Sequence, residues 1–199
     1  MIGVLIAAPL HLAYAQPGSG PTLPAASVVT APQLDGEVRL DPVWQSIAPA
    51  TGFTQNTPDE GQPISQATEL RVLYTNNAIY FSFVCFEEDP ARMVVSDARR
   101  DASLDNTDHV LIILDTYQDE QNGFVFGTNP AGLVYDGQLS KAGNDDSMGS
   151  GSSGGAGGGF NVNWDGVWDV KTQMGDYGWS AEFRIPFKTL RYPGDEVQD

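Results

Sequence analysis

The chain has 199 residues, a length that fits one domain, and hydrophobic residues make up 41% of it, enough for a sizeable core. Its formal net charge is -16 at pH 7, which argues against nucleic acid as a partner because phosphate binding needs a basic surface. Neutral or cationic ligands and divalent metals remain possible partners, and the alternative is that the acidity serves only solubility. The single cysteine, Cys85, excludes an internal disulfide and a zinc–cysteine cluster, and its apolar surroundings predict a small buried hydrophobe.

The N-terminus is an apolar stretch that is too short to span a membrane as a helix. Residues 1–15 end in "AYA", which matches the A-x-A cleavage site of a signal peptide. Residues 16–27 are rich in Pro, Gly and Ser and are expected to form a flexible linker. We therefore expect export and a mature chain that begins at Gln16. The alternative is that residues 1–15 form a buried first strand.

Strands are predicted for most of the remaining chain, because apolar residues there recur with a period of two. One helical turn comes first, in "LDPVWQSI", with Asp41 as N-cap and Pro42 at the first helical position. The predicted strands are then 67–74, 78–86, 109–117, 123–129, 132–139, 167–174 and 178–185. Many short strands joined by turns predict an all-β fold with little helix, a two-sheet antiparallel β-sandwich of immunoglobulin-like or jelly-roll-like kind.

Composition sets the expected domain limits. We assign residues 28–193 to the sandwich. Gly and Ser dominate residues 141–159, which are expected to form a flexible surface loop inserted into it. Residues 194–199 are polar and are expected to begin a linker to a further C-terminal region.

Catalysis finds little support in the sequence. It lacks the H-E-x-x-H zinc motif and the G-x-x-x-x-G-K-[ST] phosphate loop. His109 is expected to be a polar residue at a strand end. Acidic turns could supply the paired carboxylates of a glycoside hydrolase, but Asp and Asn are also ordinary turn residues, so no catalytic residue is predicted.

Two acidic clusters could supply oxygen ligands to a structural calcium ion. Neither fits the EF-hand spacing, so no metal-ligating residue is predicted. The clusters are Asp105, Asn106 and Asp108 and, further on, Asp115, Asp119 and Glu120.

The four tryptophans are expected to have different roles. Trp168 and Trp179 are in phase with apolar strand residues and are predicted to lie in the core, whereas Trp44 is predicted to plug one end of the sandwich. Trp164 precedes its strand among polar residues, and nothing in the local pattern buries it. Its ring is therefore a candidate platform for the C–H face of a sugar. Candidates to bind the sugar hydroxyls are Asn161, Asn163, Arg99 and Arg100.

Several stretches, taken in order, resemble the family 9 carbohydrate-binding module. They lie between residues 28 and 192 and read "LDGEVRLDPVWQSI", "TELRVLYTNNAIYFSFVCFEEDPARMV", "RRDASLDNTDHVLIILDTYQDEQNGFVFGTNPAGLVYDG", "NWDGVWDV" and "GWSAEFRIPFKTLRY". The resemblance implies a two-sheet sandwich, binding of a glycan or terminal sugar and often bound calcium. Characterised modules hold the sugar between two tryptophans, and "NVNW" resembles the loop that carries one of them. This gives Trp164 the stacking role and Asn161 a hydrogen-bonding role, while Phe53 or Tyr117 could replace the second tryptophan.

The most similar variant of the family lies at the N-terminus of large exported bacterial proteins. There it precedes a C-terminal region predicted to be an outer-membrane β-barrel, which implies the periplasm, outer membrane or exterior of a Gram-negative cell. We therefore expect a non-catalytic sugar-binding module of an exported protein of glycan binding and catabolism, whose full-length form can carry or accompany glycoside hydrolase activity. Two alternatives stay open. One is a structural or partner-binding sandwich without sugar affinity, which the missing second tryptophan favours, and the other is a glycoside hydrolase fragment.

Overall fold

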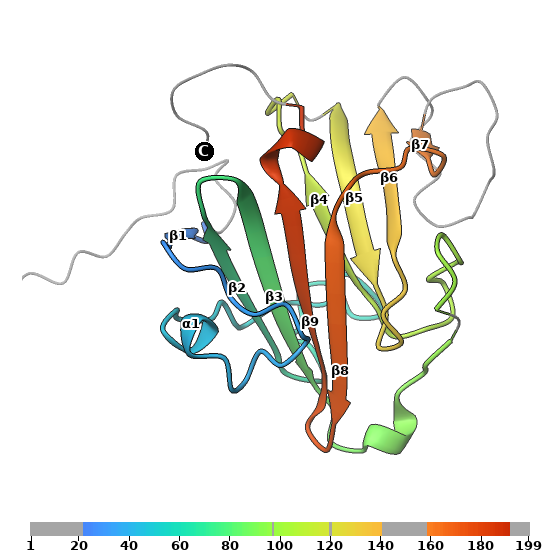
Figure 1. Cartoon of the computed structure of the whole chain (residues 1–199). Helices are drawn as coiled ribbons and strands as arrows, with labels where there is room; N and C mark the ends of the chain where they lie inside the picture. The colour runs from blue at the N-terminus through green and yellow to red at the C-terminus, as the bar shows by residue number, and fades with distance from the viewer. Residues whose placement is uncertain (1–21, 97, 120, 141–158, 192–199) are drawn as a thin grey trace, which may run out of the picture.

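Two β-sheets packed face to face make up the molecule (Figure 1), as seen in the computed structural model, which describes residues 22–96, 98–119, 121–140 and 159–191. One sheet has five strands in the order β1-β2-β3-β9-β8, and the other has four in the order β4-β5-β6-β7. All neighbouring strands are antiparallel except the short pair β1–β2. The predicted all-β sandwich with little helix is confirmed.

The strands are β1 (Ala26–Ser27), β2 (Thr68–Tyr74), β3 (Ala78–Phe86), β4 (Val110–Leu114), β5 (Asn122–Thr128), β6 (Tyr135–Ser140), β7 (Gly159–Asn161), β8 (Asp169–Gly175) and β9 (Gly178–Pro186). The helices are α1 (Pro42–Gln45) and two 3₁₀ turns, η1 (Pro90–Arg92) and η2 (Phe187–Thr189).

Several expectations fall on segments outside the described residues. These are the signal peptide (1–15), the Gly/Ser loop apart from its last residue (141–158), the C-terminal linker (194–199) and Glu120. Strand β1 lies inside the range 16–27 assigned to a linker, and it pairs with the end of β2. Within the described ranges, no helix has the length and apolar character needed to cross a membrane.

Strand β3 is the middle strand of the five-stranded sheet, and its apolar residues are buried on both faces. Phe81 faces the other sheet, whereas Tyr80 and Val84 face outward in a separate cluster. The N-terminal segment and α1 cover this outer cluster, and Asp41 caps α1 as expected. Trp44 of α1 is fully buried there. It therefore covers the outer face of the sheet, and the prediction that it plugs one end of the sandwich is wrong.

A buried carboxylate fastens this covering segment. Glu182 of β9 lies on the outward side of its strand, yet it is fully buried because the N-terminal segment lies over it. It accepts hydrogen bonds from the backbone N–H groups of Asp35 (2.9 Å) and Gly36 (2.6 Å) and from Nε1 of Trp44 (2.6 Å). Burial raises the pKa of Glu182, and the three donors offset part of that effect.

The main core fills the space between the two sheets, and Trp168 connects them. Its ring stacks on Phe183 of the five-stranded sheet, with centroids 5.7 Å apart and planes 5° apart. It also meets Phe126 of the four-stranded sheet edge-on at 5.3 Å. Trp179 is buried in the same core. The predicted core positions of Trp168 and Trp179 are therefore confirmed.

Candidate functional site

The segment 162–168 carries the chain from β7 in one sheet to β8 in the other (Figure 1). A tight turn begins it, because the N–H of Trp164 donates to the carbonyl of Asn161 (3.3 Å) and the N–H of Asn163 to Oδ1 of Asn161 (3.2 Å). Trp164 thus lies in a loop before the strand, as predicted. The crossing explains how Trp164 and Trp168 come to have different surroundings although they are close in sequence.

The Trp164 ring packs on the inner face of the four-stranded sheet and is half-buried. Its centroid lies 4.9 Å from that of Phe124 and 6.0 Å from that of Phe126. A Cβ added to Gly166 would come within 2.6 Å of this ring, so a glycine is needed beneath it. The local pattern gave no sign of burial for Trp164, and the residues that half-bury its ring come from β5, distant in sequence.

A second buried carboxylate holds the turn that positions Trp164. Asp136 of β6 has a fully buried side chain, which accepts the N–H of Gly166 at 2.6 Å and Nη2 of Arg100 at 2.7 Å. Arg100 also forms an ion pair with Asp165. Burial raises the pKa of Asp136, while the Gly166 N–H and the Arg100 charge act in the opposite direction. Arg100, which was expected to bind sugar hydroxyls, therefore stabilises the turn that carries Trp164.

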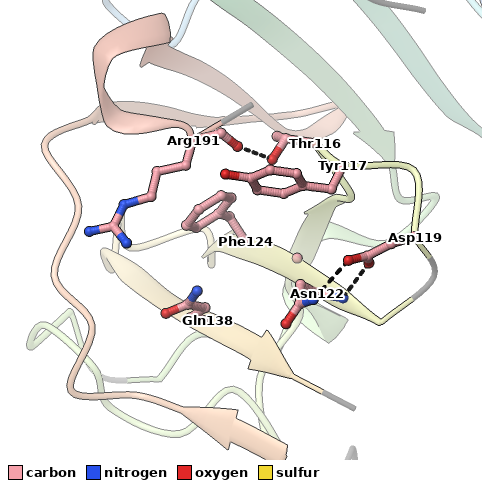
Figure 2. A pocket seen from close by; sticks show the side chains of 8 residues that line it. Thr116, Tyr117, Asp119, Asn122, Phe124, Gln138 and Arg191 are labelled. Carbon is pink, nitrogen blue, oxygen red and sulfur yellow. Dashed lines mark hydrogen bonds between the residues drawn. The ribbon is translucent and has the colours of Figure 1, made fainter. Parts of the chain in front are cut away.

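A pocket of about 320 Å³ opens at the end of the sandwich where β5 begins and β6 ends (Figure 2). It brings together the loop after β4, the first residues of β5, one residue of β6 and the segment after η2. The hydroxyl of Thr116 donates to the backbone carbonyl of Arg191, which ties the first of these stretches to the last. The lining residues are Thr116, Tyr117, Asp119, Asn122, Gly123, Phe124, Gln138 and Arg191.

The pocket is continuous with the surroundings of Trp164. Gln138 pairs with Phe124 across β5 and β6, and Asn161 pairs with Gln138 across β6 and β7. Residues opposite each other in an antiparallel pair point to the same face, so these three side chains form one row. Trp164 packs against Phe124 in this row. The structure therefore brings Asn161 and Trp164, both expected in the site, to the edge of the pocket.

Among the described residues, two charged side chains line the pocket, Asp119 and Arg191. The carboxylate of Asp119 accepts from the side-chain amide of Asn122 and from the N–H groups of Asn122 and Gln121, each at 2.8 Å. These hydrogen bonds, led by the Asn122 amide, lower the pKa of Asp119. The guanidinium of Arg191 forms no ion pair with another described residue. In Figure 2 it lies on the opposite side of the pocket from Asp119 and Asn122.

The other residues named from the sequence lie apart from the pocket lining. Arg99 and Asn163 are exposed and do not line it. Phe53, one candidate for the second stacking ring, has its carbonyl bonded to the N–H of Ile64 and also lies outside the lining. Tyr117, the other candidate, lines the pocket and is 49% exposed.

The two acidic clusters do not gather into a metal site where the structure describes them. No three His, Cys, Asp or Glu side chains of the described ranges come close enough to hold a metal ion. Asp105 accepts from the hydroxyl of Ser103 (2.8 Å), and Asp108 accepts from the N–H of Val94 (2.9 Å). These carboxylates, like that of Asp119, stabilise turns and loop contacts.

No protein-family model matches the chain, and no curated protein matches its sequence. Solved structures match it in fold. A protein from Bacteroides uniformis for which carbohydrate binding has been proposed superposes with a TM-score of 0.58 and 13% identity, over 86% of this chain and 75% of that one. A family 9 carbohydrate-binding module from Caldicellulosiruptor kristjanssonii in complex with cellotriose gives 0.47 and 17%, over 85% of this chain and 68% of that one. The complex of a family 9 module from the same organism with glucose gives 0.46 and 16%, over 87% and 73%.

The fold is thus shared with the Bacteroides uniformis protein. The structural neighbours include the family that the sequence resembles, family 9. At 13% identity the likeness to the Bacteroides uniformis protein shows the fold alone, and the binding residues have to be argued from this chain.

Proposed function

We propose that the chain is a non-catalytic carbohydrate-binding module that holds a sugar in the pocket at the end of the sandwich. The observation that carries the proposal is the meeting of Tyr117 and Phe124 with the amides of Asn122 and Gln138 in one pocket. Ligand sites in proteins are typically concave and combine aromatic walls with a few polar groups, and their volumes start at about 300 Å³. This pocket is at the small end, which favours one or two sugar units over a long chain.

Apolar groups of the lining can stack on a sugar ring, and polar groups can form hydrogen bonds to its hydroxyls. The exposed ring of Tyr117 can pack on the C–H face of the sugar, with Phe124 beneath as the floor. The amides of Asn122 and Gln138 can both donate and accept, which suits hydroxyl groups. We assign Trp164 to support Phe124 and extend the aromatic surface, so the stacking role expected of Trp164 is shared with Tyr117.

The wider setting is also part of the proposal. The apolar segment 1–15 that ends in "AYA" supports export, and the family resemblance supports a role in glycan binding and catabolism in an envelope protein. A structural or partner-binding sandwich without sugar affinity is the second candidate. The observation that favours it is the packing of Trp164 on Phe124, which leaves the pair of facing tryptophans of the characterised modules unformed.

A glycan array with the chain tests the proposal. Binding is expected for the unmodified protein and should fall at least tenfold for Tyr117→Ala. The control is Tyr74→Ala, because Tyr74 is a similarly exposed tyrosine, at 40%, that lies outside the pocket at the end of β2. Each protein is assayed with calcium and with a chelator. If the unmodified protein binds no glycan in either condition, the structural alternative replaces the proposal.

A further inference from the structure

Arg191 supplies the pocket with a cation that no described carboxylate neutralises. Three other arginines of the described chain, Arg71, Arg100 and Arg184, form ion pairs with carboxylates at 2.7 to 3.0 Å. We infer that the pocket prefers saccharides that carry a carboxylate, that is, uronic acids, and that Arg191 selects them. This inference rests on the function proposed above and names the class of sugar.

The geometry of the guanidinium suits a carboxylate. Its planar array of N–H groups can donate two parallel hydrogen bonds to the two oxygens of one carboxylate, which a lone hydroxyl cannot accept. The Arg191 side chain runs beside Tyr117 and Phe124 in Figure 2, so a sugar ring lying on these aromatics would present a substituent to it. The aromatic rings and amides demand a hydroxylated ring, which distinguishes a sugar acid from a simple carboxylate or phosphate.

The carboxylate of Asp119 repels an anionic ligand, and its position in the pocket determines the orientation of that ligand. It is held by the three donors from Gln121 and Asn122 described above, and it lies across the pocket from Arg191. A sugar acid is therefore expected to direct its carboxylate to Arg191 and its hydroxyls toward Asn122.

The net charge of -16 favours neutral or cationic ligands when only composition is considered. At physiological ionic strength, however, charges more than about 8 Å apart are largely screened in solvent. The groups within the pocket then dominate, and the guanidinium is the cation among them. The preference should consequently weaken in high salt, because the pair is solvent-accessible.

Matched sugars test this inference directly. The full chain is titrated calorimetrically with the methyl glycosides of glucose and glucuronic acid, and of galactose and galacturonic acid, whose members differ at C6. In at least one pair the acid is expected to bind about three- to tenfold more tightly at low salt. Arg191→Gln should remove this difference by weakening binding of the acid more than binding of the neutral sugar. The hydroxyl of Thr116 donates to the backbone carbonyl of Arg191, so the substitution leaves that link intact.

The control is Arg39→Gln, which changes the net charge equally but removes a guanidinium that lies 4.3 Å over the ring of Tyr177, outside the pocket. The acid preference should survive this change. If the neutral member binds equally or better in both pairs, or if Arg39→Gln abolishes the preference as Arg191→Gln does, the inference is overturned while the sugar-binding proposal stands. If no member of either pair binds and the array is also blank, the proposed function itself fails.

Discussion

Replacing Trp164 with alanine separates packing from ligand binding. Truncation of a fully buried aromatic residue to alanine costs about 3–5 kcal/mol. The Trp164 ring is half-buried and keeps two aromatic contacts, with Phe124 and Phe126, so about 2 kcal/mol is expected. For a domain of this size that loss lowers the midpoint of thermal unfolding by about 4–8 °C. Trp168→Ala should cost more, about 3–5 kcal/mol, because its ring is buried between both sheets.

Trp164→Ala should cost less stability than Trp168→Ala but more sugar affinity. Trp164→Ala removes the support of Phe124 and is expected to weaken binding of the best glycan at least tenfold, a loss of about 1.4 kcal/mol. Gly166→Ala is a second perturbation of the same contact, since the added Cβ would displace the ring without removing it. It should also weaken binding. Urea and thermal unfolding give the stabilities, and the change in tryptophan fluorescence on titration gives the affinities.

Two results would refute this reasoning. A loss of stability below about 0.5 kcal/mol for Trp164→Ala, the range typical of surface substitutions, would mean that the ring is not packed on β5. A greater loss for Trp164→Ala than for Trp168→Ala would mean that their roles are reversed.

Three further predictions concern the frame around the site. Trp179→Ala should destabilise the fold by about 3–5 kcal/mol in urea unfolding, and a change below about 1 kcal/mol would show that the ring is exposed. Arg100→Ala should cost about 2 kcal/mol at pH 7 because it removes the cation that is paired with the buried carboxylate of Asp136. Burial raises the pKa of Asp136 and so favours its protonated form in the folded state. The loss of stability caused by Arg100→Ala, compared with the unmodified protein, should therefore shrink as the pH falls. An equal loss at pH 5 and 7 would contradict this. Cys85 is partly buried, and burial raises the pKa of its thiol to about 12, so a thiol reagent at pH 8 should label the folded protein much more slowly than the unfolded one; equally rapid labelling of both would contradict this.

Local patterns predicted the strands and the cap of α1. Alternation over a few residues determines which side of a strand faces the core, so Trp168 and Trp179 could be placed in it. The Asp41-Pro42 pair marks a helix start through a hydrogen bond within the same turn, and the carboxylate does accept the N–H of Val43 at 2.6 Å. These features depend on neighbours in sequence, and for that reason the sequence alone reveals them.

The pocket could not be predicted in the same way, because its parts come from distant segments. Thr116 and Arg191, which join its two walls, are 75 residues apart. The burial of Trp164 likewise depends on Phe124 of β5, and that of Trp44 on the outer face of β9. Tyr117 was placed at the end of the predicted strand 109–117 and was found only as a substitute for a missing tryptophan, whereas β4 ends at Leu114 and leaves it in the loop that follows. Nothing in the local sequence distinguished Gln138 or Arg191 from other polar surface residues.

Mapping a bound sugar onto individual residues tests the central claim most directly. Amide and side-chain NMR signals of the isotope-labelled chain are followed while the best glycan from the array is added. The account predicts saturable shifts confined to the pocket and its edge, at Tyr117, Asn122, Phe124, Gln138, Asn161 and the indole of Trp164. Shifts that cluster instead on the outer face near Trp44, or the absence of any saturable shift, would contradict it.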